Sequence, residues 1–315
     1  MAQKLVNEEK RSMYEKVVRI HLERGPVDHD YSFGFMAELL EDVLSLYDNC
    51  PKVEYINAPV NICGDVRSRY GDILDVFRTC GWPFEQKYVF LGNLFDGGKF
   101  SLETLVLLFC CKLCWPENFV IMRGYFENEI VKTERSFIGE LRVKYPDGTQ
   151  WQTLNVHFKT LLSRLPCVTI LNRKIVCLNG MVTSNIKNEK NVVSIKNGNT
   201  WESHFTRLEV VYGEIDVAVQ ITPNKIEEET KVLRDLLKSI DMSMVINSNN
   251  VIKQGYQFSL ANQLLTLTTG TNMAKTIKNR GVVMMMDRQN KVHFKNIYGL
   301  EGQENPEQKR VTLRC

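Results

Sequence analysis

The chain has 315 residues, of which 43% are hydrophobic and 24% are charged, and this supply of apolar side chains is sufficient for a substantial core. Forty basic residues against thirty-seven acidic ones leave a formal net charge of +3, with no long run of either sign. The composition therefore excludes a strongly charged nucleic-acid-binding or membrane-surface protein, and it predicts a soluble globular one.

The cysteines predict a reducing environment. Nine cysteines are scattered through apolar stretches without the regular spacing of a disulfide framework, which indicates reduced thiols in the cytoplasm or the nucleus. In "CCKLC", Cys110, Cys111 and Cys114 form either a metal or redox cluster or, as the surrounding helical pattern favours, buried apolar positions of a helix. The N-terminus lacks the apolar stretch of a signal peptide, and no apolar run is long enough to cross a bilayer.

The first half of the chain alternates helices and strands. Apolar residues at helical spacing predict two helices within residues 10–50. Within residues 58–128, the apolar strands "APVNIC", "KYVFL" and "NFVIMR" enclose two helices, "YGDILDVFRTCG" and the segment from Leu102 to Leu113. Such β-α-β-α-β alternation predicts parallel strands whose following loops meet at one edge of the sheet.

The second half, residues 166–298, is richer in strands. Short runs rich in Val, Ile, Leu and Thr predict a second sheet with one helix from Ile226 to Ile240. The strand candidates are "CVTIL", "KIVCL", "RLEVVY", "DVAVQI", "MSMVIN", "QLLTLTT", "VVMMMD" and "KVHFKN". The Asn-rich segment from Asn185 to Asn199 predicts a surface loop. We predict one domain over residues 1–298, followed by a loosely ordered polar tail over residues 299–315.

Taken together, the strand-end loops resemble a known family. The stretch from Ile62 to Asn128 begins "ICGDVRSRYGD", continues through "VFLGNLFDGGKFSLE" and ends "MRGYFEN". It is similar to the catalytic segment of the metal-dependent phosphoprotein serine/threonine phosphatases, in particular the type-one branch. "LPCVTILNRKIVCLNGMV", "VIKQGYQF" and "NRGVVMMMDRQNKVHF" extend the similarity. It implies a four-layer α/β (α+β) fold with a central β-sandwich flanked by helices, and a reaction in which paired metal ions activate water for attack on phosphorus.

Most positions that hold metal or phosphate in this family carry other residues here. Among the metal ligands only Asp65 is retained, because Arg67 stands at a histidine and Asn93 at the bridging carboxylate. The other positions are Tyr125 at a ligand asparagine, Phe126 at the proton-donating histidine, Asn179 and Asn249 at two later histidines, Gly97 at a phosphate-binding arginine and Met273 at an active-site tyrosine, with Asp96 and Glu127 retained.

These departures predict the loss of the reaction. Two dications repel one another, and a lone carboxylate with neutral amides is a poor support for them. We therefore predict a binding or regulatory pseudophosphatase that needs no cofactor. The alternative is a weakly active serine/threonine phosphatase that holds two divalent ions of manganese, iron or zinc, and a third interpretation is an idle paralogue.

The retained carboxylate needs another partner once the metals are gone. We predict a salt bridge from Arg67 to Asp65 or Asp96, with Tyr125 and Phe126 filling the space of the lost ligands. The alternative is that Arg67 points to solvent. The chain's five histidines fall outside all of these loops and are predicted to be structural: His21, His29, His157, His204 and His293.

The resemblance also suggests partners. In type-one relatives, short apolar peptides of regulatory subunits dock in a groove on the second sheet. Phe258 keeps an aromatic residue there and Phe294 is expected at a core position nearby, whereas Lys291 places a charge where the groove should be apolar. We predict regulatory or substrate-like protein partners that differ from those of the relatives, bound by a monomer or in a hetero-complex. The competing hypothesis is that phosphopeptides are captured without cleavage by Arg67, Arg69 and Arg123.

Overall fold

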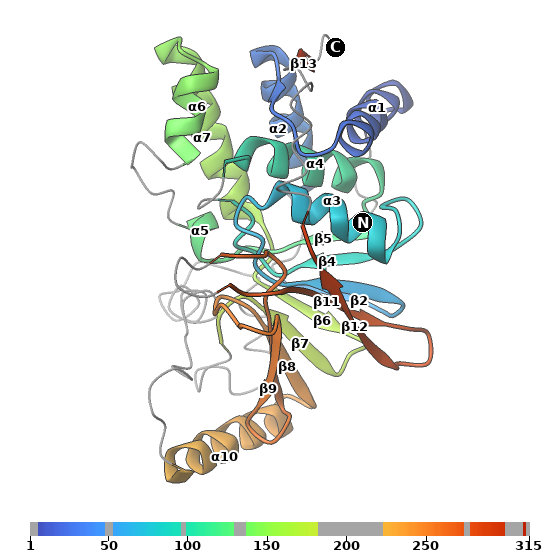
Figure 1. Cartoon of the computed structure of the whole chain (residues 1–315), viewed down its shortest axis with the longest axis vertical. Coiled ribbons are helices and arrows are strands. Elements are labelled where there is room, and N and C mark those ends of the chain that lie inside the picture. Colours follow the sequence, from blue (N-terminus) through green and yellow to red (C-terminus); the bar gives the residue numbers. More distant parts are fainter. Residues whose placement is uncertain are drawn as a thin grey trace.

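Two β-sheets pack face to face, and helices cover both outer sides (Figure 1). The computed structural model describes residues 6–47, 53–95, 99–128, 137–181, 223–273, 278–299 and 311–312. The strands predicted at "RLEVVY" and "DVAVQI" and the loop predicted from Asn185 to Asn199 lie outside these ranges. Within the described ranges, no helix combines the length and the hydropathy needed to span a bilayer.

The five-stranded sheet contains the predicted alternation. Its order is β12-β11-β3-β4-β5, in which β3, β4 and β5 are parallel and β11 and β12 are antiparallel to their neighbours. The loops after β3, β4 and β5 therefore meet at one edge, as predicted. The elements are β3 (Val60–Cys63), α3 (Tyr70–Cys80), β4 (Tyr88–Phe90), α4 (Ser101–Cys114), β5 (Phe119–Ile121), β11 (Gly281–Met286) and β12 (Val292–Ile297).

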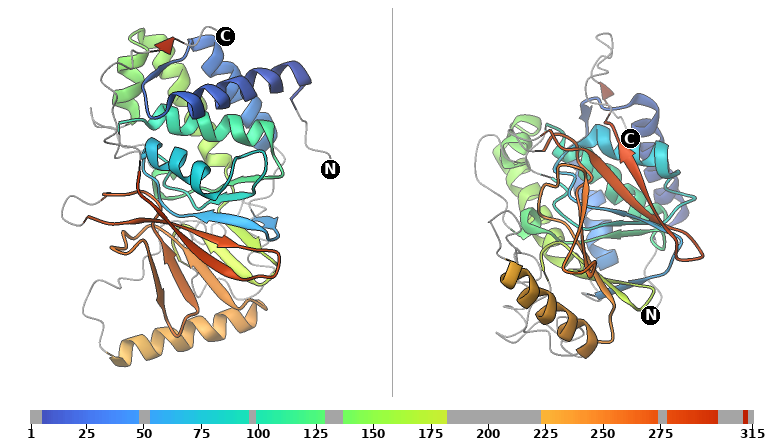
Figure 2. Two further views of the ribbon diagram at one scale, coloured as in Figure 1. Left: turned by 45° about the vertical axis from the view of Figure 1, so that its right-hand side comes forward. Right: turned by 60° about the horizontal axis from the view of Figure 1, so that its bottom comes forward.

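The six-stranded sheet is mixed and has the order β2-β6-β7-β8-β10-β9. Its strands are β2 (Val53–Ile56), β6 (Val168–Leu171), β7 (Ile175–Leu178), β8 (Met244–Asn247), β9 (Tyr256–Ser259) and β10 (Leu264–Leu267). The amphipathic helix α10 (Pro223–Ser239) covers its outer face (Figure 2), where Leu233 and Leu237 pack among the side chains of this sheet. The helix predicted from Ile226 to Ile240 is thus confirmed with shifted ends.

Most helices cover the outer face of the five-stranded sheet. They are α1 (Glu8–Arg24), α2 (Phe33–Tyr47), α3, α4, α6 (Phe137–Lys144) and α7 (Gly148–Arg164), and the short α5 (Tyr125–Asn128) follows β5. Side-chain caps explain where two of them begin: Asn7 accepts from the Lys10 backbone N–H before α1, and Asp147 accepts from the Thr149 backbone N–H before α7.

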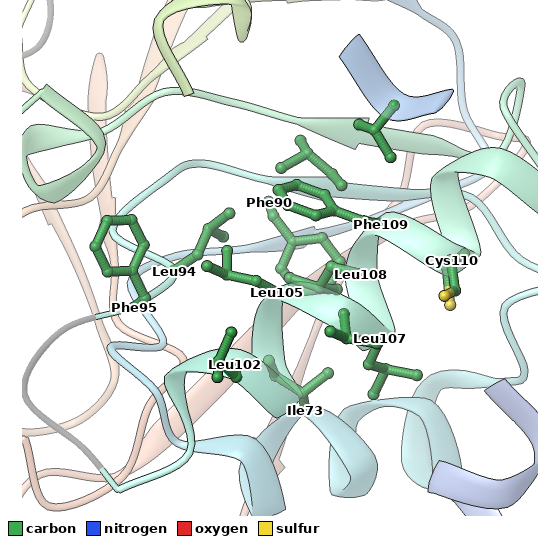
Figure 3. Close-up of a cluster of buried hydrophobic side chains, with 14 of the residues drawn as sticks. Ile73, Phe90, Leu94, Phe95, Leu102, Leu105, Leu107, Leu108, Phe109 and Cys110 are labelled. Atoms are coloured by element: carbon green, nitrogen blue, oxygen red, sulfur yellow. The ribbon is translucent and has the colours of Figure 1, made fainter. Parts of the chain in front are cut away.

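Alternate residues of the central strands separate two cores. Tyr88 and Phe90 of β4 face the helices, whereas Val89 faces the six-stranded sheet. The core under the helices is centred on α4, all of whose residues are buried (Figure 3). Cys110, Cys111 and Cys114 are therefore apolar packing positions of α4, and burial raises the pKa of the Cys111 and Cys114 thiols, which makes them less reactive.

A third, very small sheet lies among the N-terminal helices, at the end of the molecule opposite α10 (Figure 1). It consists of β1 (His29–Asp30) and β13 (Val311–Thr312), which pair in parallel. β13 falls within residues 299–315, where we predicted a loosely ordered tail, so part of that segment forms a strand.

Candidate functional site

Loops from both sheets converge on Asp65, which follows β3 of the five-stranded sheet. The Asp65 residue is fully buried. Arg67 after β3, Asn93 after β4 and Asn249 after β8 all have positive φ, at 43°, 52° and 79°. Residues other than glycine rarely adopt a positive φ, and those that do are concentrated at functional sites. The loops around Asp65 therefore have a backbone conformation typical of functional sites.

The Asp65 carboxylate accepts hydrogen bonds at both oxygens. It therefore has the converging donors that a buried charge requires. The donors to Oδ1 are Ser248 Oγ at 2.6 Å, the Asn249 backbone N–H at 3.1 Å and Asn179 Nδ2 at 3.2 Å, and the donors to Oδ2 are Arg67 Nη2 at 2.8 Å, Arg67 Nε at 3.1 Å and Asn93 Nδ2 at 2.9 Å.

Arg67 is fixed in the site and does not point to solvent. Both Nε and Nη2 donate to Asp65 Oδ2, and Nη2 also donates to the Asn249 carbonyl at 3.0 Å. The guanidinium carbon lies 5.2 Å from the centre of the Phe126 ring, a cation–π distance. The predicted salt bridge to Asp65 is confirmed. Asp96, the other predicted partner, and Gly97 lie outside the described residues.

Asn93 uses its amide in a way that a carboxylate could not. Its Nδ2 donates to Asp65 Oδ2 at 2.9 Å and to Asn249 Oδ1 at 3.2 Å, while its Oδ1 accepts from the Phe126 backbone N–H at 3.0 Å. An aspartate in this place could accept from Phe126 but would face Asp65 with a second negative charge. The amide therefore completes a network that suits one carboxylate only.

Glu127 holds two loops together. Its carboxylate accepts from the backbone N–H groups of Asn93 at 2.9 Å, Leu94 at 2.8 Å and Gly124 at 2.7 Å. Burial raises the pKa of this carboxyl, and the three backbone donors oppose the rise. The loops cross so closely that a Cβ on Gly124 would lie 2.4 Å from the Asn93 nitrogen. The arrangement therefore assigns Glu127 a structural role.

The structure brings most of the remaining predicted residues to the same place. Asn179 Oδ1 accepts from the Tyr125 backbone N–H at 3.3 Å, opposite the bond from its Nδ2 to Asp65. The Tyr125 and Phe126 rings contact each other edge to face, 5.4 Å apart between centres. Met273 differs, because its backbone N–H donates to Asn279 Oδ1 and not to a member of this network.

The three arginines proposed for phosphate capture are directed to different carbonyls. Arg67 donates to Asn249 as well as to Asp65, Arg69 Nη2 donates to the Asn272 carbonyl at 2.8 Å, and Arg123 Nη1 lies 3.5 Å from the Ser163 carbonyl. Each acceptor belongs to a different segment of the chain. The guanidinium groups therefore have fixed local partners, and phosphate capture stays a hypothesis.

One residue that sequence reasoning missed is central to the site. Ser248 Oγ accepts from the Asp65 backbone N–H at 2.7 Å and lies 2.6 Å from Asp65 Oδ1. It also lies 2.9 Å from the Leu267 carbonyl, so it ties the loop after β3 to the six-stranded sheet. Its position directly after β8, beside Asn249, was the available signal.

The site does not fit a pair of divalent metals. In the described part of the chain, no group of three or more His, Cys, Asp or Glu side chains is placed to hold a metal ion. The Asp65 oxygens instead face a guanidinium and amide N–H groups, which repel a cation. We therefore derive no chemical step through a metal here.

A second feature is an exposed aromatic patch, made of Tyr256 and Phe258 on β9 and Phe294 on β12. The Tyr256 and Phe294 rings are stacked with centres 4.0 Å apart, and Phe258 meets Phe294 edge to face at 6.1 Å. β9 is an edge strand of the six-stranded sheet, and β12 is an edge strand of the five-stranded sheet. Phe294 is partly buried and packs against the core between the two sheets, although it lies on the edge strand β12. Lys291, which directly precedes β12, is exposed.

Comparisons with known proteins agree with the observed fold. Residues 58–248 match the family model described as calcineurin-like phosphoesterase. The structure is similar to that of a protein serine/threonine phosphatase from Saccharomyces cerevisiae with similarity to human phosphatase PP5, with 20% identity and a TM-score of 0.73 over 86% of this chain and 91% of that one. A cold-active protein-tyrosine phosphatase of a psychrophilic Shewanella species has 11% identity and a TM-score of 0.51, covering 80% and 84%. At these identities the structural likeness shows the metallophosphoesterase fold.

Proposed function

Because the chain belongs to the calcineurin-like phosphoesterase family while its central carboxylate is engaged by an arginine, we propose that it is a pseudophosphatase that binds protein partners and does not hydrolyse phosphoesters. One observation carries this proposal: Arg67 and Asn93 donate to Asp65 at the place where the resembling enzymes hold two metals. The buried, reduced cysteines suit a cytoplasmic or nuclear location.

Metal content and hydrolysis test the catalytic part of the proposal. We expect less than a tenth of an equivalent of manganese, iron or zinc per chain after purification and dialysis, measured by elemental analysis. Phosphoserine peptides and aryl phosphates should be hydrolysed no faster than in a no-enzyme control, with and without added manganese, while an active serine/threonine phosphatase assayed in parallel turns them over. Two metal equivalents together with manganese-dependent turnover would instead establish the alternative, a weakly active phosphatase.

The aromatic patch supports the binding part of the proposal. Tyr256 and Phe258 are exposed on an edge strand and pack against the partly buried Phe294, and exposed aromatic groups of this kind commonly anchor protein interfaces. Lys291, exposed directly before β12, adds a positive charge to this strand end, which favours a partner segment that carries a carboxylate over a purely apolar one. The partners should therefore differ from those of the type-one phosphatases.

Matched variants separate this surface from the Asp65 site. We expect Phe258→Ala to abolish partner recovery in quantitative co-purification, and Arg67→Ala to leave it unchanged. Tyr55→Ala is the control, because Tyr55 is also an exposed aromatic residue but lies on β2, at the opposite edge of the same sheet. Loss of binding in Arg67→Ala alone, together with preference for phosphorylated peptides in calorimetry, would favour phosphate capture by Arg67, Arg69 and Arg123.

A further inference from the structure

The small sheet of β1 and β13 stands apart from the two large sheets. β1 has β13 as its strand partner, with His29 opposite Val311 and Asp30 opposite Thr312. Figure 1 shows β13 beside α2, where the chain returns to its N-terminal helices. A two-residue strand pair contributes little to a fold of this size, so the question is what β1 is built to hold.

The inner side of β1 is fixed without any help from β13. The His29 backbone N–H donates to Glu103 Oε1 at 3.1 Å, and the His29 carbonyl accepts from Lys144 Nζ at 2.9 Å. The His29 ring is fully buried and stacks on His21, with ring centres 4.4 Å apart. Tyr145 donates to the carbonyl of the following Tyr31 at 2.9 Å. β1 is therefore preformed, and a segment that pairs with it need not first order it.

The outer side of β1 is left for pairing. Backbone groups of successive residues in a strand point in opposite directions. Because the His29 groups face Glu103 and Lys144, those of the residues on either side face β13. A net contribution of about 0.5–1.5 kcal/mol per hydrogen bond makes so short a pairing exchangeable.

We propose that β1 is a strand-addition site for an extended peptide and that the segment around Val311 and Thr312 is its resident, exchangeable ligand. This segment reads "QKRVTLRC", with two β-branched residues suited to a strand. Its basic residues, Lys309, Arg310 and Arg314, are opposite in sign to Asp28 and Asp30, which flank His29 in the sequence.

Tethering explains why this segment occupies the site. Residues 300–310 connect it to Gly299, the last residue described before it. A short tether raises the effective concentration of the segment to the order of millimolar, so weak pairing is enough to fill β1 in the same chain. A free peptide of similar sequence must compete with this resident segment.

Peptide binding to the full chain tests the proposal. The probe is a fluorescent peptide of residues 306–315 with Cys315→Ser, followed by anisotropy. In a chain with Val311→Pro and Thr312→Pro, the one N–H of these two residues that faces β1 is lost and the proline rings disfavour strand pairing. β1 is then open, so this chain should bind the probe at least tenfold more tightly than the unaltered chain. A chain with Gln303→Pro, outside β13, should behave like the unaltered chain. A probe that carries the same two prolines should bind none of the three chains.

Hydrogen exchange supplies a second measurement. In the double proline chain, the Asp30 amide should exchange at least tenfold faster and slow again when the probe is added, while the His29 amide, held by Glu103, stays protected. Equal probe affinity for all three chains, or an unchanged Asp30 amide, would overturn the proposal. A dimer in light scattering that dissociates in the double proline chain would overturn it as well, since the segment would then belong to a second copy.

Discussion

Two buried polar regions of this molecule solve the same physical problem in opposite ways. Around Asp65, a buried charge is retained because guanidinium, amide, hydroxyl and backbone donors all converge on it. Around His29, two imidazoles are buried in stacked contact, and neither ring nitrogen of His29 has a hydrogen-bond partner in the described part of the chain. The Asp65 region stabilises a buried charge with converging donors, whereas the His29 region disfavours the charged form of the imidazole.

The pKa values of the two histidines show that their burial disfavours protonation. Burial lowers the pKa of His21 and lowers that of His29 to about 4, and the nearby Lys144 ammonium adds to both effects. His21 still bonds Tyr31 and Tyr70 through its ring nitrogens, at 3.0 and 2.8 Å. The Asp65 site is therefore a satisfied hydrogen-bond network, whereas the folded state disfavours protonation of the histidine pair.

Removing the central carboxylate should have the largest effect. Asp65→Ala leaves the partly buried Arg67 charge and several amide donors without their acceptor, so we expect the free energy of unfolding to fall by about 3–5 kcal/mol in urea denaturation. Asp241→Ala is the matched control, because Asp241 also pairs with a cation, Lys174 at 2.6 Å, but on the surface, where a loss of at most about 1 kcal/mol is expected. Equal losses would show that the buried network is not special.

A second carboxylate next to Asp65 should also destabilise the fold. Asn93→Asp replaces an amide donor 2.9 Å from Asp65 with a like charge, which raises the pKa of the pair and should lower stability at pH 7 by about 2–3 kcal/mol. A raised folded-state pKa means that the folded state holds the extra proton more tightly, so the loss should shrink as the pH falls toward 4.

Added manganese should neither restore stability to Asn93→Asp nor produce turnover, because the Arg67 guanidinium and the Asn179 amide would still donate to the Asp65 oxygens. Asn172→Asp is the control, since Asn172 also has positive φ and donates through Nδ2, but to Asn290 at an exposed turn. A metal-dependent rise in melting temperature seen only in Asn93→Asp would mean that one reversion rebuilds a metal site.

Much of this fold could be predicted because local and global signals agree. The strands β3, β4 and β5 are continuous apolar runs between amphipathic helices, as expected for parallel strands covered on both faces. In contrast, β9 was missed because three of the four residues in "YQFS" are exposed, so the strand is defined by pairing with β10 and not by burial. The helices α6 and α7 were also missed, although the Asp147 cap was visible.

The site was predictable where its partners are close in sequence. Arg67 and Asp65 are two residues apart, so the need for a counter-charge led directly to their pairing. Asn179 and Ser248 reach Asp65 from the other sheet, so only the resemblance, which placed Asn179 and the neighbouring Asn249 at ligand positions, pointed to them. The physical reason is that the donors are assembled by the packing of two sheets.

Removing the guanidinium should cost less than removing the carboxylate. In Arg67→Ala, Asp65 keeps its bonds to Ser248, Asn93 and Asn179, so we expect a loss of about 1–3 kcal/mol, the range for a charge-assisted hydrogen bond. Arg67→Lys keeps the charge but lacks the two-pronged geometry, and it should recover only part of the loss. An unchanged melting temperature in Arg67→Ala would remove the structural role of this salt bridge.

The smallest expected effect is a change in pH dependence at the histidine pair. The folded state depresses the pKa of His29 to about 4, against about 6.5 in the unfolded chain. The unfolded state therefore binds more protons between these values, and stability from the neutral imidazole is lost as the pH falls from 7 toward 4. His29→Phe keeps a stacking ring without the titratable nitrogens, so the drop in unfolding free energy between pH 7 and pH 5 should be about 1–2 kcal/mol smaller than in the unaltered chain.

Glu103, whose pKa burial raises to about 7, has the opposite pH trend, and measuring the difference between the two chains cancels its contribution. His293→Phe, at an exposed site, should leave the drop unchanged, and parallel curves for His29→Phe and the unaltered chain would show that the buried pair does not respond to protons.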